Sequence, residues 1–208
     1  MIRAFVQARM SSRRFPGKVL APLAGRPLLA HLVDRISRAL PLERVVIATS
    51  AEGSDDPLDA YARLLGVTVF RGELENVFSR FRACLALHPC EAFFRVCADS
   101  PLLDPELFGR FLEVRAPRGY DLVTNVFPRT FPKGTSLELV RSETFASIDV
   151  GRLTPEQAEH VTKVYYDEPA RFSIANVESN DPANAGEDIA IDTIEDLRRI
   201  EGRVAGRR

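Results

Sequence analysis

The chain has 208 residues, which is enough to bury a full hydrophobic core, and one large α/β domain is expected rather than two small ones. Hydrophobic residues make up 45% of it and charged residues 27%, as in an ordinary globular protein. The formal net charge of −1 argues against a general nucleic-acid-binding protein, in which a basic domain is expected.

The cysteines and the apolar runs indicate the cellular compartment of the protein. The three cysteines, Cys84, Cys90 and Cys97, match no zinc-binding spacing, and their odd number suits a reducing compartment. Cys97 lies in an apolar run and is expected in the core. The chain enters an apolar run at once, and no apolar stretch approaches the roughly 18 residues that a membrane span needs. We therefore expect a cytoplasmic protein with no leader and no membrane partner.

Apolar runs alternate with amphipathic runs through the first half of the chain. The runs that predict buried strands cover residues 2–6, 44–50, 67–70 and 92–98. The runs that predict helices cover residues 27–40, 55–65, 75–87 and 105–114. Four strand–helix repeats imply right-handed crossovers, and so an α/β fold with a mostly parallel sheet and helices on both faces.

The second of these helices opens with two acidic residues, Asp55 and Asp56, followed by Pro57. The two carboxylates could form a metal pair, or one of them could cap the helix. Capping is the favoured interpretation, because the apolar residues that follow have helical spacing and Pro57 suits a first helical turn.

The pattern changes after residue 116, where proline and glycine become frequent. Short runs that predict strands cover residues 121–124, 136–140, 172–177 and 189–192. Further helices are predicted to begin at Ser142, Thr154 and Asp192.

Residues 1–26 are strongly basic. They contain six cationic side chains and no acidic one: Arg3, Arg9, Arg13, Arg14, Lys18 and Arg26. Because the basic stretch connects a predicted strand to a predicted helix, its cations and backbone N–H groups should lie at the carboxyl end of that strand. This arrangement is typical of a polyphosphate site.

Two aspartates, Asp99 and Asp192, follow predicted strands and should reach the same edge of the sheet as the basic stretch. A few carboxylates together with phosphate oxygens and water are what Mg²⁺ prefers. The combination indicates a metal–triphosphate site and nucleotidyl transfer, with pyrophosphate as the leaving group. Each feature alone has an ordinary explanation, such as a helix cap or a solvated lysine, and the residues alone leave the nucleotide unidentified.

The stretch Gln7-Ala-Arg-Met-Ser-Ser-Arg-Arg-Phe-Pro-Gly-Lys18 resembles the signature Q-A-R-M-G-S-x-R-L-P-G-K. That signature opens the spore-coat polysaccharide biosynthesis protein F group, within the cytidylyltransferases that make CMP-activated acidic sugars; CMP-Kdo synthetase and acylneuraminate cytidylyltransferase are relatives. The likeness continues in order through residues 46–50, 55–57, 69–72, 76–80, 98–102, 159–162 and 191–197.

The resemblance implies a three-layer, Rossmann-like fold of the nucleotide-diphospho-sugar-transferase type. It implies one nucleotidyltransferase domain over residues 1–208, in which residues 1–116 bind the nucleotide and residues 117–208 bind the acceptor and build a dimer. The implied activity is transfer of CMP from CTP to an acidic sugar, with Mg²⁺ as cofactor, in surface polysaccharide biosynthesis. The implied partners are these two small molecules and a second copy of the chain, without nucleic acid.

Carried over by position, the resemblance assigns roles to individual residues. The triphosphate would be bound by Arg9, Ser12, Arg14 and Lys18, and the catalytic residues would be Lys18, Arg14 and Arg9. Gln7 and Ala8 would lie close to the nucleotide, Arg80 near its base and ribose, and Asp99 and Asp192 on Mg²⁺. The acceptor would lie near Asn125, Arg129, Glu138 and His160, although His160 is equally well explained as a helix-end residue.

The chain departs from the family pattern at three places. Ser11 and Ala98 each stand where the pattern has glycine, and a positive φ at Ser11 would be strained. Lys133-Gly-Thr-Ser136 stands where the group tends to have Asp-Gly-x-Asp, which leaves the acceptor's identity open. Two alternatives to the cytidylyltransferase stay open. One is a glycosyltransferase that uses a nucleotide-sugar donor, because that class shares the fold, and the other is a nucleotide-binding homologue without turnover, which the changes at Lys133 and Ser136 suggest.

Overall fold

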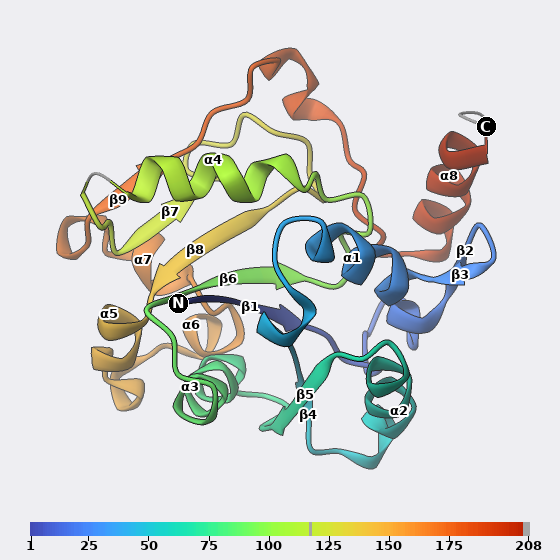
Figure 1. The fold of residues 1–208 in the computed structure, drawn as a ribbon, viewed down its shortest axis with the longest axis horizontal. Helices are drawn as coiled ribbons and strands as arrows, with labels where there is room; N and C mark the ends of the chain where they lie inside the picture. Colours follow the sequence, from blue (N-terminus) through green and yellow to red (C-terminus); the bar gives the residue numbers. More distant parts are fainter. Residues whose placement is uncertain (117, 206–208) are drawn as a thin grey trace.

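The computed structural model describes residues 1–116 and 118–205, with side chains to residue 203. Its centre is a seven-stranded sheet in the order β5-β4-β1-β6-β8-β7-β9 (Figure 1). The strands of this sheet are β1 Ile2–Gln7, β4 Val45–Ser50, β5 Thr68–Gly72, β6 Ala92–Cys97, β7 Leu122–Thr124, β8 Leu137–Arg141 and β9 Ile174–Asn176. A separate small hairpin pairs β2 Pro22–Leu23 with β3 Arg26–Pro27.

The sheet is mostly parallel, as the strand–helix alternation predicts. β5, β4, β1 and β6 run parallel to one another, whereas β8 is antiparallel to both of its neighbours, β6 and β7. β9 is again parallel to β7. The carboxyl ends of β1 and β6, which are adjacent strands in the middle of the sheet, therefore open on one edge, where ligands of such sheets bind.

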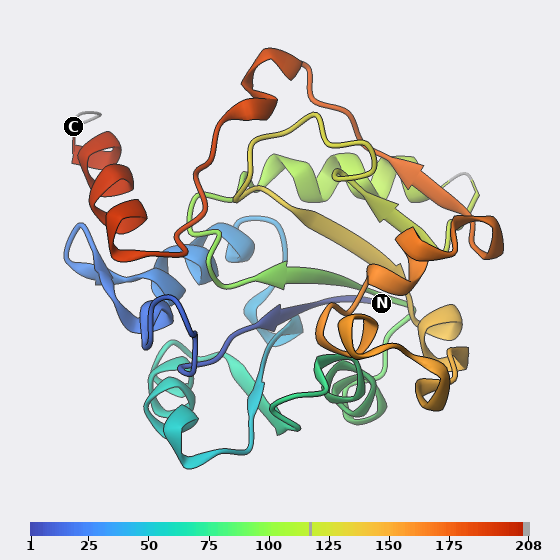
Figure 2. The same ribbon diagram turned by 180° about the vertical axis from the view of Figure 1, so that it is seen from behind.

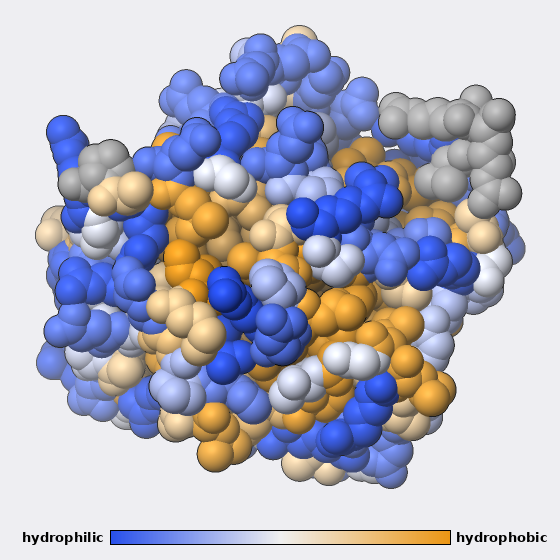
Figure 3. All heavy atoms as spheres, in the orientation of Figure 1, coloured by the Kyte–Doolittle hydropathy of each residue, from blue (hydrophilic) through white to orange (hydrophobic). Residues whose placement is uncertain are grey.

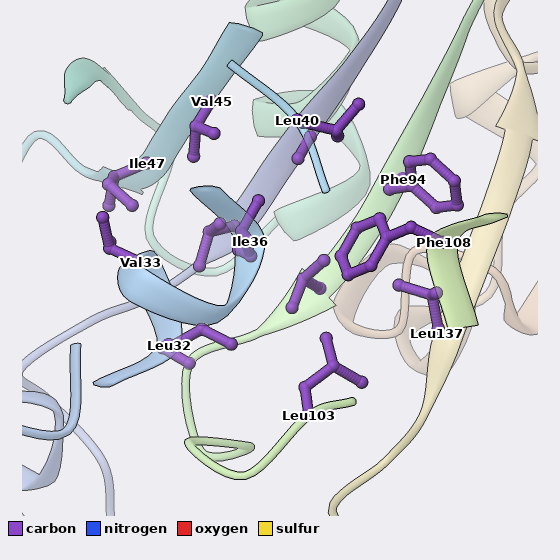
Figure 4. Close-up of a cluster of buried hydrophobic side chains, with 14 of the residues drawn as sticks. Leu32, Val33, Ile36, Leu40, Val45, Ile47, Phe94, Leu103, Phe108 and Leu137 are labelled. Carbon is purple, nitrogen blue, oxygen red and sulfur yellow. The ribbon is translucent and has the colours of Figure 1, made fainter. Parts of the chain in front are cut away.

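Helices cover both faces of the sheet, so the predicted three-layer α/β fold is confirmed (Figures 1 and 2). The helices are α1 Leu28–Ser37, α2 Asp56–Leu64, α3 Val77–Leu87, α4 Glu106–Arg115, α5 Ser142–Ser147, α6 Pro155–Glu159, α7 Lys163–Asp167 and α8 Ile194–Ala205. One face packs on α1, α2 and α4, where Phe108 packs on Phe94 in a buried cluster that also contains Ile36 (Figure 4). The other face packs on α3, α5 and α7 and is aromatic, with Phe5 stacked on Phe93 at 4.8 Å between ring centroids.

The last helix, α8, lies beside the β2–β3 hairpin and apart from the main sheet in both ribbon views (Figures 1 and 2). A small apolar cluster of Leu23, Leu28, Ile191 and Ile200 joins the helix to the hairpin and to α1. This packing brings the chain just before α8 next to the amino-terminal basic stretch.

The strand predicted at residues 189–192 is wrong. Residues 188–192 run beside a loop instead of joining the sheet: an isolated bridge pairs Asp188 with Lys133, and Ile189 N donates to Lys133 O at 2.8 Å. Ile189 and Ile191 produce the alternating pattern because they pack into the small cluster at α8. Alternation reports that one side of a segment is buried, but it does not identify the partner.

No helix in the described part of the chain is long and apolar enough to cross a membrane. On the face drawn in Figure 3, hydrophobic residues show mainly towards the middle, between hydrophilic residues. Large apolar side chains that stand exposed, such as Leu64 and Leu87, are scattered on separate helices.

Candidate functional site

A cavity of about 350 Å³ opens at the carboxyl ends of β1 and β6. It is lined by Gln7, Ala8, Arg9, Ser12, Arg13, Arg14, Lys18, Val19, Arg95, Cys97, Ala98, Asp99, Glu159, His160 and Asp192. The structure thus brings together the basic stretch, both predicted aspartates and His160, which lie far apart in the sequence.

Lys18 joins the two aspartates. Its Nζ lies 3.1 Å from Asp99 Oδ2 and 2.9 Å from Asp192 Oδ1, and it also donates to Ile191 O at 3.2 Å. Only 12% of the Lys18 side chain is exposed. Burial acts to lower the pKa of Lys18, but Asp99 and Asp192 outweigh it, so the pKa is raised and the ammonium stays charged. The two carboxylates therefore converge on a point where a cation is already held.

Arg14 reaches the same carboxylate from the solvent side. Its Nη2 lies 2.9 Å from Asp192 Oδ1, and 66% of its side chain is exposed. Two cations of one loop thus face Asp192, and Arg14 has the freedom to turn towards a ligand.

Backbone geometry turns the basic loop back over the sheet edge. Gly17 has a φ of 74° and its N–H donates to Met10 O at 2.8 Å, which closes the loop. Ala24 is the one non-glycine residue with positive φ in the described chain, so Ser11 adopts an ordinary conformation and the strain predicted for it is absent.

Asp55 stands at the N-cap position of α2, as predicted, but its side chain makes no capping hydrogen bond and anchors the basic loop instead. Its fully buried carboxylate accepts hydrogen bonds from Met10 N at 2.7 Å, Thr49 Oγ1 at 2.8 Å and Ser50 N at 3.0 Å. Burial raises the pKa of Asp55, but the hydrogen bonds outweigh burial and hold the pKa below its ordinary value. Asp55 therefore joins the basic loop to β4 through these hydrogen bonds.

Asp192 is positioned from both sides. Ile191 N donates to Asp99 O at 3.0 Å, and Asp196 in the first turn of α8 accepts from Asp192 N at 3.1 Å. Gly134 lets the neighbouring loop approach: its φ is +89°, and a Cβ there would lie 2.4 Å from Ala190 N. The segment Lys133–Ser136, predicted on the acceptor side, therefore packs against the residues that lead to Asp192.

The far wall of the cavity comes from the end of α6. Thr154 and Gln157 form a capping box at the start of that helix, and Glu159 at its end lies 3.8 Å from Arg9 Nη2. His160 follows as the exposed C-cap residue and lines the cavity. Its position is compatible with either of the two interpretations from the sequence.

Four predicted site residues lie outside the cavity lining: Arg80, Asn125, Arg129 and Glu138, the last of which is only 3% exposed. Arg80 is fully buried, donates to Glu73 O at 2.7 Å, and has its pKa lowered to about 10 by burial and then by Arg9. Asn125 is also fully buried, and its amide donates to Thr135 O and accepts from Leu137 N. Arg129 donates to Ser136 Oγ at 3.1 Å. Their contact with a ligand stays a prediction.

Sequence reasoning missed Arg95, and it placed Cys97 in the core. Arg95 lines the cavity, donates through Nη2 to Gln7 Oε1 at 2.7 Å, and donates through Nη1 to Glu138 Oε2 at 3.0 Å. Half-buried Cys97 lines the cavity too, and burial raises the pKa of its thiol to about 12. Arg95 is the single charged residue in an apolar strand run, and this could have indicated a site, because a buried charge needs a partner.

No group of three or more His, Cys, Asp or Glu side chains that could hold a metal ion occurs among the described residues. Asp99 and Asp192 nevertheless fit a Mg²⁺ site of the kind that nucleotides complete, because Mg²⁺ in such sites uses one or two carboxylates plus phosphate oxygens and water.

Comparisons with known proteins identify the family of the chain. A family model described as cytidylyltransferase matches residues 4–202. The chain is 33% identical over 204 residues to the spore coat polysaccharide biosynthesis protein SpsF of Bacillus subtilis, covering 94% of this chain and 83% of that protein. It is 31% identical over 106 residues to 3-deoxy-manno-octulosonate cytidylyltransferase of Pelobacter propionicus, covering 51% of this chain and 41% of that protein.

Solved structures share the fold. A cytidylyltransferase from Leptospira borgpetersenii superposes with a TM-score of 0.93 at 25% identity, over 99% of this chain and 87% of that one. A CMP:2-keto-3-deoxy-manno-octonic acid synthetase complexed with CTP superposes with a TM-score of 0.72 at 15% identity, over 100% of this chain and 99% of that one.

Proposed function

The chain belongs to the cytidylyltransferase family, and from that premise we propose that it transfers CMP from CTP to an acidic sugar with release of pyrophosphate. The observation that carries the proposal is the convergence of Lys18, Arg14, Asp99 and Asp192 at one end of the cavity. A family that uses CTP and a site that pairs cations with two carboxylates both suit a triphosphate. SpsF is by name a polysaccharide biosynthesis protein, which favours surface polysaccharide biosynthesis as the setting.

The proposed reaction is an in-line displacement at the α-phosphorus of CTP. A hydroxyl oxygen of the acceptor forms the new bond to phosphorus and releases its proton to solvent, the bond to the bridging oxygen breaks, and pyrophosphate leaves with the electron pair. Lys18, Arg14 and Arg9 stabilise the negative charge that develops on the phosphoryl oxygens, so positioning and electrostatics supply most of the rate enhancement. Ser12 and the loop N–H groups bind the same triphosphate.

Asp99 and Asp192 would hold Mg²⁺, which supplies neutralisation of phosphoryl oxygens when bound. The chain's own part is to keep both carboxylates converged, which Lys18 does by placing its Nζ 3.1 Å from Asp99 Oδ2 and 2.9 Å from Asp192 Oδ1. Asp99→Asn and Asp192→Asn should each raise the Mg²⁺ concentration needed for half-maximal activity by tenfold or more. An unchanged Mg²⁺ titration in both variants would assign the metal to other residues.

The acceptor is proposed to carry a carboxylate. Five cationic side chains line the cavity, against three acidic ones, so an anionic acceptor is favoured beside the triphosphate. A guanidinium can hold a carboxylate in a bidentate contact, which suits Arg9 or Arg13. We also propose that the protein is cytoplasmic and forms a homodimer. Light scattering of the purified chain would test the dimer.

The decisive experiment is a pyrophosphate-release assay of the full chain with each of the four ribonucleoside triphosphates against a panel of sugar acids, with Mg²⁺. We expect release with CTP and at least one sugar acid, and none without an acceptor. Binding of CTP with no release across the panel would favour a homologue without turnover. Transfer of sugar from a nucleotide-sugar with no pyrophosphate release would indicate a glycosyltransferase.

A further inference from the structure

A row of polar side chains crosses one face of the sheet between the aromatic core and the cavity. Its members come from four consecutive strands in the sheet order: Gln7 on β1, Arg95 on β6, Glu138 on β8 and Thr124 on β7. Arg95 stands opposite Glu138 in the strand register, and Glu138 stands opposite Thr124. The facing residues lie on one side of the sheet because side chains alternate along a strand.

The inner end of this row is saturated with hydrogen bonds. Glu138 is only 3% exposed, and its Oε1 accepts from Thr162 Oγ1 and Tyr166 OH, each at 2.6 Å. Its Oε2 accepts from Arg95 Nη1 at 3.0 Å. A carboxylate held in this way does not reach the cavity, whose lining does not include it. Glu138 therefore acts on a ligand only through Arg95.

The outer end of the row fixes an amide. A guanidinium has donors and no acceptor, so the atom of the Gln7 amide that faces Arg95 Nη2 at 2.7 Å has to be the oxygen. The NH₂ group of Gln7 is then the amide's free end. It has no hydrogen-bond partner within the described residues, and Gln7 lines the cavity. Without Arg95 the amide could turn over and present either end to a ligand.

We propose that Arg95, held by Glu138, is a positioning residue that locks the Gln7 amide with its NH₂ group towards the cavity, where it donates to an oxygen or nitrogen acceptor of the bound ligand. This inference rests on the proposed function, because the ligand is CTP or the sugar acid that receives CMP. It also changes the predicted role of Glu138 from a residue near the acceptor to the partner that keeps Arg95 in place.

The test is a double-mutant cycle on the full chain with Gln7→Ala, Arg95→Met and the double variant. The affinity for CTP is measured by calorimetry with Mg²⁺, and KM and kcat are measured with a sugar acid that supports pyrophosphate release. Each single variant should lose roughly 10- to 100-fold in affinity for the same ligand, as expected when a buried polar contact loses its partner. The double variant should lose little more than either single one.

Two further variants separate positioning from a structural role. Gln7→Glu keeps an oxygen for Arg95 but removes the donor, so it should lose as much affinity as Gln7→Ala. Arg95→Lys retains a donor for the Gln7 oxygen and should recover part of the loss seen in Arg95→Met. Thermal unfolding of every variant shows whether the fold is kept. The double-mutant cycle compares the double variant with the two single variants, so a loss of stability that they share does not produce coupling.

Coupling between the two substitutions in the CTP affinity would show that the Gln7 NH₂ group donates to the nucleotide. Coupling in the KM of the sugar acid would show that it donates to the sugar acid. Penalties that simply add in both measurements, or full affinity in Gln7→Glu, overturn the inference while leaving the proposed function standing. A wild-type chain that binds no CTP and releases no pyrophosphate overturns the proposed function, and this inference falls with it.

Discussion

Lys18 is the residue on which the candidate site is centred. It is the mostly buried cation between Asp99 and Asp192, and its ammonium keeps two converging carboxylates from repelling each other. The sequence marks it as one cation of a solvated loop, but in the structure only 12% of its side chain is exposed. The difference arises because a charged residue near an opposite charge can be buried with little net cost, and sequence does not show which distant charges will meet.

Replacing Lys18 by alanine should therefore have two effects. We expect kcat for pyrophosphate release to fall about 100-fold or more, as when a preorganised electrostatic contact is lost. We also expect the free energy of unfolding without ligand to fall by about 1–3 kcal/mol, because two partly buried carboxylates lose a charged partner. Steady-state kinetics and urea unfolding measure the two effects.

A matched control exists on α7. Lys163 also bridges two carboxylates, with Nζ 2.8 Å from Asp167 Oδ1 and 3.5 Å from Glu156 Oε2, but it lies outside the cavity lining. Lys163→Ala should leave kcat unchanged and cost under about 1 kcal/mol of stability, as for other partly exposed ion pairs. Equal losses of kcat in the two variants would show that the effect of Lys18 is not specific to the site.

At the scale of elements, periodic patterns predicted the first four strands and their helices because each of these packs its apolar side on the central sheet. The pattern failed at residues 189–192, where two isoleucines are buried by α8 and the hairpin and no sheet strand forms. At Asp55 it gave the correct helix start but not the role of the side chain, which accepts from β4 and from the basic loop instead of capping α2. Both failures occur where tertiary contacts beside the site override a local preference.

The loop around Gly134 gives an element-scale prediction. Gly134→Ala adds a Cβ that would lie 2.4 Å from Ala190 N, at a φ of +89°, so the loop and the chain before Asp192 have to move apart. We expect a loss of stability of about 1–3 kcal/mol and a lower kcat, because the Asp192 carboxylate loses its position beside Lys18. A Mg²⁺ titration of activity should shift to higher concentration, which a loss of stability alone would not produce.

Gly109 is the matched control for that substitution. It lies within α4, its Cβ would meet nothing within 4 Å, and its backbone is helical. Gly109→Ala should leave kcat and the Mg²⁺ titration unchanged and raise stability by up to about 1 kcal/mol. A normal Mg²⁺ titration in Gly134→Ala would mean that Asp192 does not depend on this loop.

At the scale of the whole molecule, the fold class could be predicted from the sequence, but the order of the strands could not. Spacing along the chain shows that a strand exists and does not show that β8 inserts antiparallel between β6 and β7. That insertion brings Glu138 beside Arg95, so the polar row next to the cavity was beyond reach from the sequence alone. The basic loop and Asp99 could be predicted at one edge, because the carboxyl ends of parallel strands share an edge of a sheet. Asp192 reaches that edge on a segment outside the sheet, so its position was predicted from a strand that does not form.

The stability of the whole chain should depend on pH through its hydrogen-bonded aspartates. The folded structure lowers the pKa of Asp55, where hydrogen bonds outweigh burial, and lowers that of Asp196 to about 2, chiefly through Arg199. A lowered pKa contributes stability that is fully present above the unfolded-state pKa of about 4 and is lost as pH falls through the folded-state pKa. The contribution of these two aspartates to the free energy of unfolding should therefore be constant between about pH 5 and 7 and should fall below about pH 4.

Asp55→Asn tests the origin of this dependence. The variant should lose about 1–3 kcal/mol at pH 7, because an amide nitrogen cannot accept the donors that face the carboxylate. The difference from the wild type should shrink at pH 3, where the wild-type carboxylate also begins to protonate. Asp34→Asn, which alters a half-exposed carboxylate paired with Arg26, should change stability by under about 1 kcal/mol at either pH. Urea midpoints at pH 7, 5, 4 and 3 would measure all three proteins, and an equal deficit of Asp55→Asn at every pH would rule out the charge of Asp55 as the source.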